Sequence, residues 1–424
     1  MHFENIYMRN VSNPVIIDQV SCPWNQCKVQ IAQQLTSNCS IGPNKNLNMS
    51  LKLNIATLPI LFLLASVANA KPVVFNILKK YGGKVNEDIT LPLTNAWKDA
   101  CATPGQSKVV LNGPCKGPIE LKVRGTLVAP GDLSFFKWGS WVSFERVDQL
   151  TLSGNGTFDG QGKSVWGKYN GALPINIRFD FITNSMIRGI TSLDDKQFHL
   201  HVFACKNVTI FHLNIKAPGD SPNTDGIHMG RSTGINIIDS KIGTGDDCIS
   251  LGDGNRDILI QKVACGPGHG ISIGSLGKYE NEEPVVGVKV VDCNLRNTMN
   301  GVRIKIWPAS LPGASSNMHF ENIYMRNVSN PVIIDQVYCP WNQCKAQIPS
   351  KIKISQVSFK NIRGTSQTKE AVKLLCSNEI PCENVEITDI DLAYQGSDGP
   401  ATSQCTNVNP TILGKQNPPA CTLK

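Results

Sequence analysis

The sequence has little charge and no long apolar run. Charged residues make up 17% of its 424 positions and aromatic residues 7%, and such a low charged fraction argues against a highly charged helical bundle. No run of Lys or Arg exceeds two residues, and the net charge of +8 is spread along the chain, which argues against a nucleic-acid-binding arm but leaves a soluble anionic partner open. The most apolar run, Ile55 to Val67, has 13 residues and is too short to cross a bilayer comfortably.

Cysteine, by contrast, is frequent, and fifteen cysteines favour a secretory, disulfide-forming compartment. The apolar run follows a short basic segment that starts at Met49, and it is followed by Ala68-Asn69-Ala70. These are the three parts of a cleavable secretion signal, so we expect a signal peptide over 49–70 and a mature chain that begins at Lys71. A buried strand or helix is the alternative interpretation of this run.

The segment before the signal is a near copy of a later one. Met1 to Ile31 repeats Met318 to Ile348, with Ser21 in place of Tyr338 and Val29 in place of Ala346. Structural repeats usually diverge as they adapt to different neighbours, so this near-identity suggests a duplicated gene fragment. We therefore expect residues 1–48 to be absent from the mature protein, which leaves 71–424 as a single catalytic domain.

The predicted mature chain keeps an even number of cysteines and a positive charge. It has 12 cysteines and carries 37 basic and 31 acidic side chains, a net charge of +6. Three close cysteine pairs suit local disulfides: Cys339/Cys344, Cys376/Cys382 and Cys405/Cys421. Asn155, Asn207 and Asn327 open glycosylation sequons, which fits a secreted glycoprotein.

From Asn207 onward a short strand pattern returns every 23 to 34 residues. In each copy a polar residue or Gly precedes two apolar residues separated by one other, and the copies begin at Asn207, Gly234, Asp257, Gly287, Asn317, Lys351 and Asn384. Alternating apolar positions at such a regular step, without amphipathic helical stretches, predict stacked β-coils. We therefore expect an all-β fold, a right-handed, single-stranded parallel β-helix, which is a solenoid. A β-sandwich, which also has many short strands, is the alternative fold. In the β-helix, residues 95–101 are expected to form an N-terminal helical cap.

Candidate catalytic side chains fall at equivalent places of consecutive coils. Asp225 lies in one unit, the pair Asp246 and Asp247 in the next, and His269 in the one after. Arg303 and Lys305 follow in the fourth unit, on one side of a strand because they are two residues apart. Each residue alone is typical of a turn or a solvated surface, but coils stacked roughly 4.8 Å apart would bring all six together. Three adjacent carboxylates would repel one another, so one of them should retain a proton above its usual pKa and remain available as a general acid.

These motifs carry a family resemblance. Asn223-Thr-Asp225-Gly226, the GTGDDC of 243–248, the GPGHG of 266–270 and the RIK of 303–305 occur in the order and spacing that resemble the polygalacturonases of glycoside hydrolase family 28. The resemblance extends from Val74 to the C-terminus, and 270–307 is similar to the plant pollen-type exopolygalacturonases. It implies a right-handed parallel β-helix that hydrolyses the α-1,4 bonds of galacturonan with inversion, without a metal or cofactor.

Matching the motifs residue by residue implies a role for each. Asp246 would protonate the leaving oxygen, Asp225 and Asp247 would activate water, and His269 would tune Asp246 or hold the sugar. Substrate binding is assigned to four further residues: Arg303, Lys305, Tyr338 and Asn223. An inverting pair is expected to stand roughly 6.5 to 9.5 Å apart to admit the water.

The sequence leaves several alternatives open. His199 and His201 resemble a metal pair, but no further ligand is evident. A non-catalytic β-helix that binds wall polysaccharide and a Ca²⁺-dependent pectate lyase are the competing functions, and exo and endo action are not distinguished. The expected protein is a secreted monomer of the plant cell wall whose partner is pectin, with no nucleic-acid partner and no membrane contact after signal cleavage.

Overall fold

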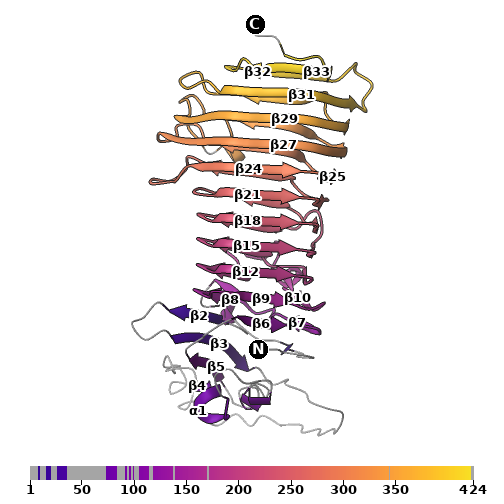
Figure 1. Cartoon of the computed structure of the whole chain (residues 1–424). Coiled ribbons are helices and arrows are strands. Elements are labelled where there is room, and N and C mark those ends of the chain that lie inside the picture. The colour runs from indigo at the N-terminus through magenta and orange to yellow at the C-terminus, as the bar shows by residue number, and fades with distance from the viewer. Residues whose placement is uncertain are drawn as a thin grey trace, which may run out of the picture.

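Strands pair side by side in parallel, one coil of chain stacked on the next along a single axis (Figure 1). The computed structural model describes residues 8–9, 16–20, 26–35, 73–83, 91–92, 95–96, 99, 105–113, 118–136, 139–169, 171–342 and 344–421. Within these ranges every strand pairing is parallel except β2 with β3 and β3 with β5. The predicted right-handed parallel β-helix is confirmed, and the β-sandwich alternative is wrong.

One face of the helix is a 14-stranded sheet to which each regular coil contributes one short strand. In spatial order its strands are β4 (Val73–Asn76), β5 (Gly105–Gly113), β3 (Gln26–Leu35), β2 (Ile16–Val20), β8 (Ser140–Glu145), β11 (Ile175–Asp180), β14 (Leu200–Phe203), β17 (Ile227–Gly230), β20 (Ile249–Leu251), β23 (Ile271–Leu276), β26 (Asn300–Ile306), β28 (Asn330–Asp335), β30 (Glu370–Leu375) and β32 (Thr402–Thr406).

The remaining strands form a 19-stranded sheet that holds a second and a third strand of each coil. The second strands are β6 (Ile119–Lys122), β9 (Leu150–Ser153), β12 (Thr183–Arg188), β15 (Lys206–Phe211), β18 (Thr233–Ile238), β21 (Arg256–Gln261), β24 (Val285–Val291) and β33 (Thr411–Asn417). The third strands are β7 (Thr126–Val128), β10 (Thr157–Asp159), β13 (Thr191–Leu193), β16 (Asn214–Lys216), β19 (Lys241–Gly243), β22 (Ala264–Cys265) and β25 (Asn294–Arg296), with β1 (Met8–Arg9) beside β7. In later coils both positions merge into the long strands β27 (Gly313–Val328), β29 (Ile352–Ser366) and β31 (Glu383–Tyr394).

The core is a set of columns in which like residues stack from coil to coil. One column runs through Val208, Ile235, Ile258, Val288 and Met318, each at most 2% exposed. Burying such a side chain contributes about 1.5–3 kcal/mol, so the alternation read from the sequence is the main stabilising feature of each coil. The polar residue that opens each copy has a left-handed backbone, as at Asn207 with φ of 54°, which turns the chain into the second strand.

One of the predicted repeat starts is wrong. The sequence pattern placed a start at Lys351, but Met318 pairs with Val357, so the residue equivalent to Asn317 is Gln356. Both have positive φ, 57° and 56°. Residues 344–355 contain an inserted loop and the first part of β29. The apolar pair at Ile352 and Ile354 has the same spacing as a repeat but lies five residues too early.

Several predictions about the N-terminal part lie outside the described residues. The signal over 49–70 and position 21 are among them, and the predicted cap over 95–101 falls mostly on residues that are not described. At this end α1 (Ile77–Lys80) is a helical turn in which Asn76 Oδ1 accepts a hydrogen bond from the Lys79 amide. The described residues 91–92, 95–96 and 99 are helical as well. From residues 1–48 come β1, β2 and β3, and β2 pairs in parallel with β8.

Disulfides and short helices complete the described part. The three predicted local disulfides are confirmed, and a fourth joins Cys248 to Cys265. The described 3-10 helices are the single turns η1 (Leu133–Phe135), η2 (Gly162–Ser164) and η3 (Pro340–Asn342). Across the described ranges, no helix has the length and apolar character needed to traverse a bilayer.

Candidate active site

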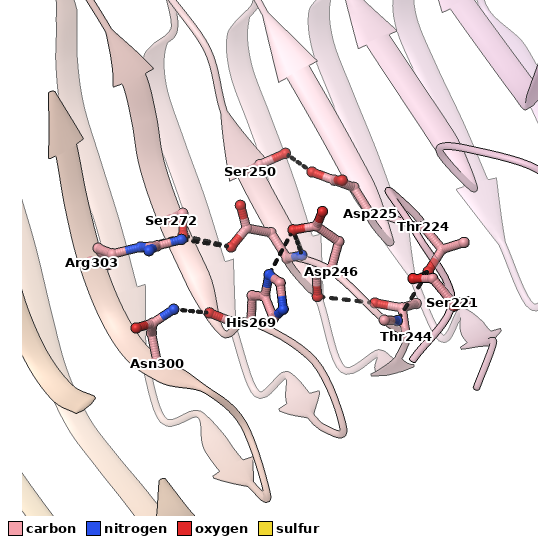
Figure 2. A network of polar contacts seen from close by, with 12 residues as sticks. Ser221, Thr224, Asp225, Thr244, Asp246, Ser250, His269, Ser272, Asn300 and Arg303 are labelled. Atoms are coloured by element: carbon pink, nitrogen blue, oxygen red, sulfur yellow. Dashed lines mark hydrogen bonds and ion pairs between the residues drawn. The ribbon is translucent and has the colours of Figure 1, made fainter. Parts of the chain in front are cut away.

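A four-residue pattern leads into four successive strands of the 14-stranded sheet. It occurs as Asp225-Gly-Ile-His228 at β17, Asp247-Cys-Ile-Ser250 at β20, His269-Gly-Ile-Ser272 at β23 and Asn300-Gly-Val-Arg303 at β26. The third residue of each copy is fully buried in the core, so the fourth points outward. The structure therefore brings the predicted residues of four coils onto one face, as the sequence analysis expected (Figure 2).

Three carboxyl groups meet at the start of β17 and β20. One oxygen from each of Asp225, Asp246 and Asp247 lies within 4.8 Å of the others. This is closer than the roughly 6.5 to 9.5 Å expected from the sequence for an inverting acid and base, so the expectation of a wide spacing is wrong. The reason is the stacking itself, because Asp225 and Asp247 occupy the same position of adjacent coils.

Asp246 is the most exposed of the three, with 23% of its side chain accessible. Its Oδ1 atom accepts hydrogen bonds from His269 Nδ1 at 2.9 Å and from the Asp247 amide at 2.8 Å. Burial acts to raise the pKa of Asp246, but the hydrogen bond and charge of His269, the charge of Lys305 and the Asp247 amide outweigh it and hold the pKa below its ordinary value.

Asp225 lies deeper and has the opposite electrostatics. Burial, together with the charges of Asp246 and Asp247, raises the pKa of Asp225 well above its usual value, although a hydrogen bond from Ser250 opposes the shift. Ser250 Oγ lies 2.6 Å from Asp225 Oδ2 and 2.7 Å from His228 Nδ1. Burial lowers the pKa of His228 to about 4, so this imidazole is neutral near neutral pH. The raised pKa that the sequence analysis expected for one carboxyl group therefore falls at Asp225, whereas that analysis had assigned the role of general acid to Asp246.

Asp247 is paired with a lysine. Lys305 Nζ lies 2.6 Å from Asp247 Oδ2, and Ser272 Oγ donates to Asp247 Oδ1 at 2.7 Å. Burial disfavours the ammonium form, but the carboxylate of Asp247 outweighs it and raises the pKa of Lys305. Asp247 is only 1% exposed, so this ion pair is a buried one that would leave an uncompensated charge if either partner were removed.

The predicted cation pair lies next to the carboxyl groups. Arg303 and Lys305 project from the same side of β26, and Arg303 Nη2 is 3.6 Å from Asp247 Oδ1. The ring of Tyr338 covers both cations, with its centroid 5.5 Å from the Arg303 guanidinium carbon and 5.6 Å from Lys305 Nζ. Tyr338 in turn packs edge-on against Trp307. Thus the structure places three of the four predicted substrate-binding residues together.

The fourth, Asn223, stands apart in an exposed turn. It has a left-handed backbone with φ of 51°, and the neighbouring Thr224 is the residue that contacts the site, because its hydroxyl accepts from the Gly245 amide at 3.0 Å. His199 and His201 do not form a metal pair. His199 is buried against Ser192, whereas His201 lies on the outer face, stacked between His228 and Phe203.

Sequence reasoning missed Ser250, Ser272 and His228, which contact the carboxyl groups directly or through one another. Aligning the four copies of the four-residue pattern would have found them, because each stands three residues after a predicted site residue. A metal ligand set is conceivable only at the three carboxyl groups, since among the described residues this is the one such group of acids, cysteines and histidines. Lys305 already compensates one of those charges, which reduces the attraction for a cation.

Comparison with known proteins identifies the family. Residues 101–421 match the model of glycosyl hydrolases family 28. A polygalacturonase of Gossypium barbadense is 52% identical over 383 residues, covering 85% of this chain and 94% of that protein. An exopolygalacturonase of Oenothera organensis is 52% identical over 354 residues, covering 79% of this chain and 98% of that protein.

A solved structure supports the same assignment. The polygalacturonase from Erwinia carotovora ssp. carotovora aligns with a TM-score of 0.54 and 25% identity, over 70% of this chain and 85% of that one. With a matching fold, a family model over most of the chain and relatives at about half identity, the chain belongs to glycosyl hydrolase family 28.

Proposed function

We propose that the protein is a secreted polygalacturonase that hydrolyses α-1,4-galacturonosyl bonds of pectin from chain ends. The observation that carries this proposal is the cluster of three carboxyl groups within 4.8 Å of one another. Arg303 lies beside this cluster (Figure 2), and Lys305 forms an ion pair with Asp247. Polygalacturonases and exopolygalacturonases of plants at about half identity support the substrate and the exo mode.

Asp246 is the proposed proton donor. A general acid must reach the glycosidic oxygen, and among the three carboxyl groups only Asp246 combines substantial exposure with a bond to a titratable partner, His269. Binding a sugar over Asp246 removes its remaining water, and desolvation favours the protonated form. The His269 imidazole lies where it can hold Asp246 in one orientation and transfer a proton to it.

Asp225 and Asp247 are the proposed activators of the attacking water. Both are nearly inaccessible, 7% and 1% exposed, so neither can approach a sugar carbon closely enough to form the covalent ester of a retaining enzyme. A water molecule held by their oxygens can approach it, which supports inversion despite the short spacing. The anomeric form of the first product, read by NMR within the first turnovers, tests this step.

The cations are assigned to the substrate carboxylate. Arg303 is the better donor for it, because a guanidinium binds a carboxylate through two parallel hydrogen bonds and its own contact with Asp247 is long at 3.6 Å. Lys305 is already bonded to Asp247, so its main proposed role is to hold that carboxylate in place. Tyr338 would pack against the sugar beside them, and Asn223 would contact it from the exposed turn.

A Ca²⁺-dependent lyase is the competing activity that an observation favours, since three close carboxyl groups are also what a cation would need. The salt link of Lys305 to Asp247 and the raised pKa of Asp225 count against it. A lyase yields unsaturated products that absorb in the ultraviolet and stops when Ca²⁺ is chelated. We expect saturated products and full activity with a chelator present.

The decisive experiment is product analysis on polygalacturonate, with Asp246→Asn as the inactive form. General acid–base groups contribute about 10²- to 10⁴-fold, so turnover should fall by that factor while thermal unfolding stays cooperative. Asp257→Asn, the same exchange at an exposed side chain in β21 of the other sheet, should retain activity. Monomer as the sole early product supports exo action, whereas a ladder of oligomers refutes it, and no product from the unmodified protein refutes the proposed function. The proposal includes secretion to the plant cell wall as a monomer.

A further inference from the structure

A second groove lies on the 19-stranded sheet, away from the strands that carry the carboxyl groups. Its volume is about 1160 Å³, and it follows the bend between the second and third strands of successive coils. Its lining comes from β16, β19, β22 and β25 and from the turns that precede and follow them. The proposed catalytic residues lie further along the chain, in the turns that lead into the 14-stranded sheet and in β26 of that sheet. The catalytic mechanism uses none of its residues.

Unpaired cations line this groove and continue beyond it. Lys216, Lys241 and Arg296 are in its wall, and Arg326 follows Arg296 in register on the next coil. Arg363 stands one coil further, opposite Tyr324. All five side chains are exposed, and in the described part of the chain none of them forms an ion pair with a carboxylate.

The nearest acidic groups have partners of their own. Asp239, which also lines the groove, is bound by His212 Nε2 at 2.7 Å. Asp391, the neighbour of Arg363 in register, is bound by Lys415 Nζ at 2.7 Å. Three cations and one acid line the groove, so the field above it is positive.

The spacing of the cations suits a linear polyanion. They stand on five of six successive coils, and five steps of roughly 4.8 Å make a stripe roughly 24 Å long. Asn214 and Asn294 line the same groove and can bond hydroxyl groups. Tyr324, 38% exposed, lies in register with Asn294 and offers a ring against which a sugar can pack.

We propose that this groove is a second, non-catalytic binding site for galacturonan. It would keep the enzyme on the polymer between cleavages, since a chain held there leaves the catalytic face free. The polymer's identity rests on the proposed function, because galacturonan is the linear polyanion that the catalytic face is proposed to cleave. The cations and asparagines of the groove favour a linear polysaccharide that carries carboxylates.

The test compares two double variants that lose the same charge. Lys241→Gln with Arg296→Gln removes two cations from the groove, and Lys206→Gln with Lys289→Gln removes two exposed cations from the second strands. Each is measured in the full chain by affinity electrophoresis in gels containing polygalacturonate, at about 0.1 M salt. Gels with polyglutamate, a polyanion without sugars, run in parallel.

We expect the groove variant to bind polygalacturonate at least about threefold more weakly, as exposed charge pairs allow, and the control variant to bind within twofold of the unmodified protein. Equal losses in both variants, no loss in either, or equal retention by polyglutamate would overturn the proposal. Hydrolysis of a short galacturonate oligomer should be unchanged in the groove variant. If even the unmodified protein cleaves no such oligomer, the proposed function fails, but the retention data still decide whether the groove binds the polymer.

Discussion

Replacing Ser250 with Ala removes the one neutral side-chain hydrogen bond recorded for the Asp225 carboxyl group. Ser250 Oγ lies 2.6 Å from Asp225 Oδ2, and this bond works against the burial and the two neighbouring charges that raise the pKa of Asp225. A hydrogen bond to a charged group is worth about 1.5–3 kcal/mol. The bond favours the ionised form, so its loss should raise the pKa of Asp225 further.

The assay is the pH dependence of kcat/KM on a galacturonate oligomer. If Asp225 must be ionised to activate water, the acid limb of the profile should move to higher pH. Because the three carboxyl groups interact, the limb reports the cluster rather than one residue. The change in shape is small, since Ser and Ala differ by a single oxygen.

The matched control is Ser272→Ala one coil along the helix. Ser272 bonds Asp247 as Ser250 bonds Asp225, but Asp247 keeps its ion pair with Lys305, so the acid limb should move much less. A profile that falls uniformly at all pH values in the Ser250 variant, with its acid limb in place, would show that Ser250 only shapes the site. Equal shifts in both variants would refute the assignment of the raised pKa to Asp225.

Three further outcomes are expected. Asp225→Asn should raise the melting temperature at pH 7, because a carboxyl group whose pKa is higher in the folded than in the unfolded protein destabilises the fold as the pH rises between those two pKa values. Differential scanning calorimetry should show that this gain shrinks toward pH 4, and a lower melting temperature at pH 7 would contradict the expectation. Arg303→Gln should lower kcat/KM steeply on polygalacturonate and much less on a methyl-esterified oligomer, and equal losses in steady-state kinetics would make the residue structural. N-terminal sequencing of secreted protein should begin at Lys71, because cleavage after Ala70 satisfies the small-residue rule, and finding residues 1–48 attached would overturn the predicted processing.

The fold could be predicted because the β-helix repeats one local rule. Alternating apolar residues fill columns such as Val208, Ile235 and Ile258, and register follows from which residue faces inward. The prediction failed at Lys351, where Ile352 and Ile354 alternate just as a true repeat does but lie at the start of a lengthened strand. Alternation indicates the face of the strand on which a residue lies, but not its position within the coil. A loop insertion therefore shifts the start of a repeat without changing the local sequence pattern.

The same repeat made the position of the candidate site predictable, but the prediction of its residues was incomplete. The repeat length placed Asp225, Asp247 and His269 on one face. The hydrogen bonds to the first two come from residues without a distinctive sequence signal, Ser250 and Ser272. A serine in a strand is ordinary, and only the register shows that it stands beside a carboxyl group of the previous coil. The distances within the cluster could not be predicted either, because they depend on which side chains turn toward one another.

The distribution of protons over the cluster links the geometry to the proposed reaction. In the free protein Asp225 has the raised pKa and Asp246 the lowered one, whereas the reaction needs a protonated Asp246 and an ionised Asp225. A substrate carboxylate beside Arg303 would screen a cation of the site, and a sugar over Asp246 would desolvate that carboxyl group. Both effects would change the pKa values that set the proton distribution in the free protein. Substrate binding is then itself the step that moves the proton toward the leaving oxygen, and a bound galacturonate monomer should shift the titration of the cluster even when no bond is broken.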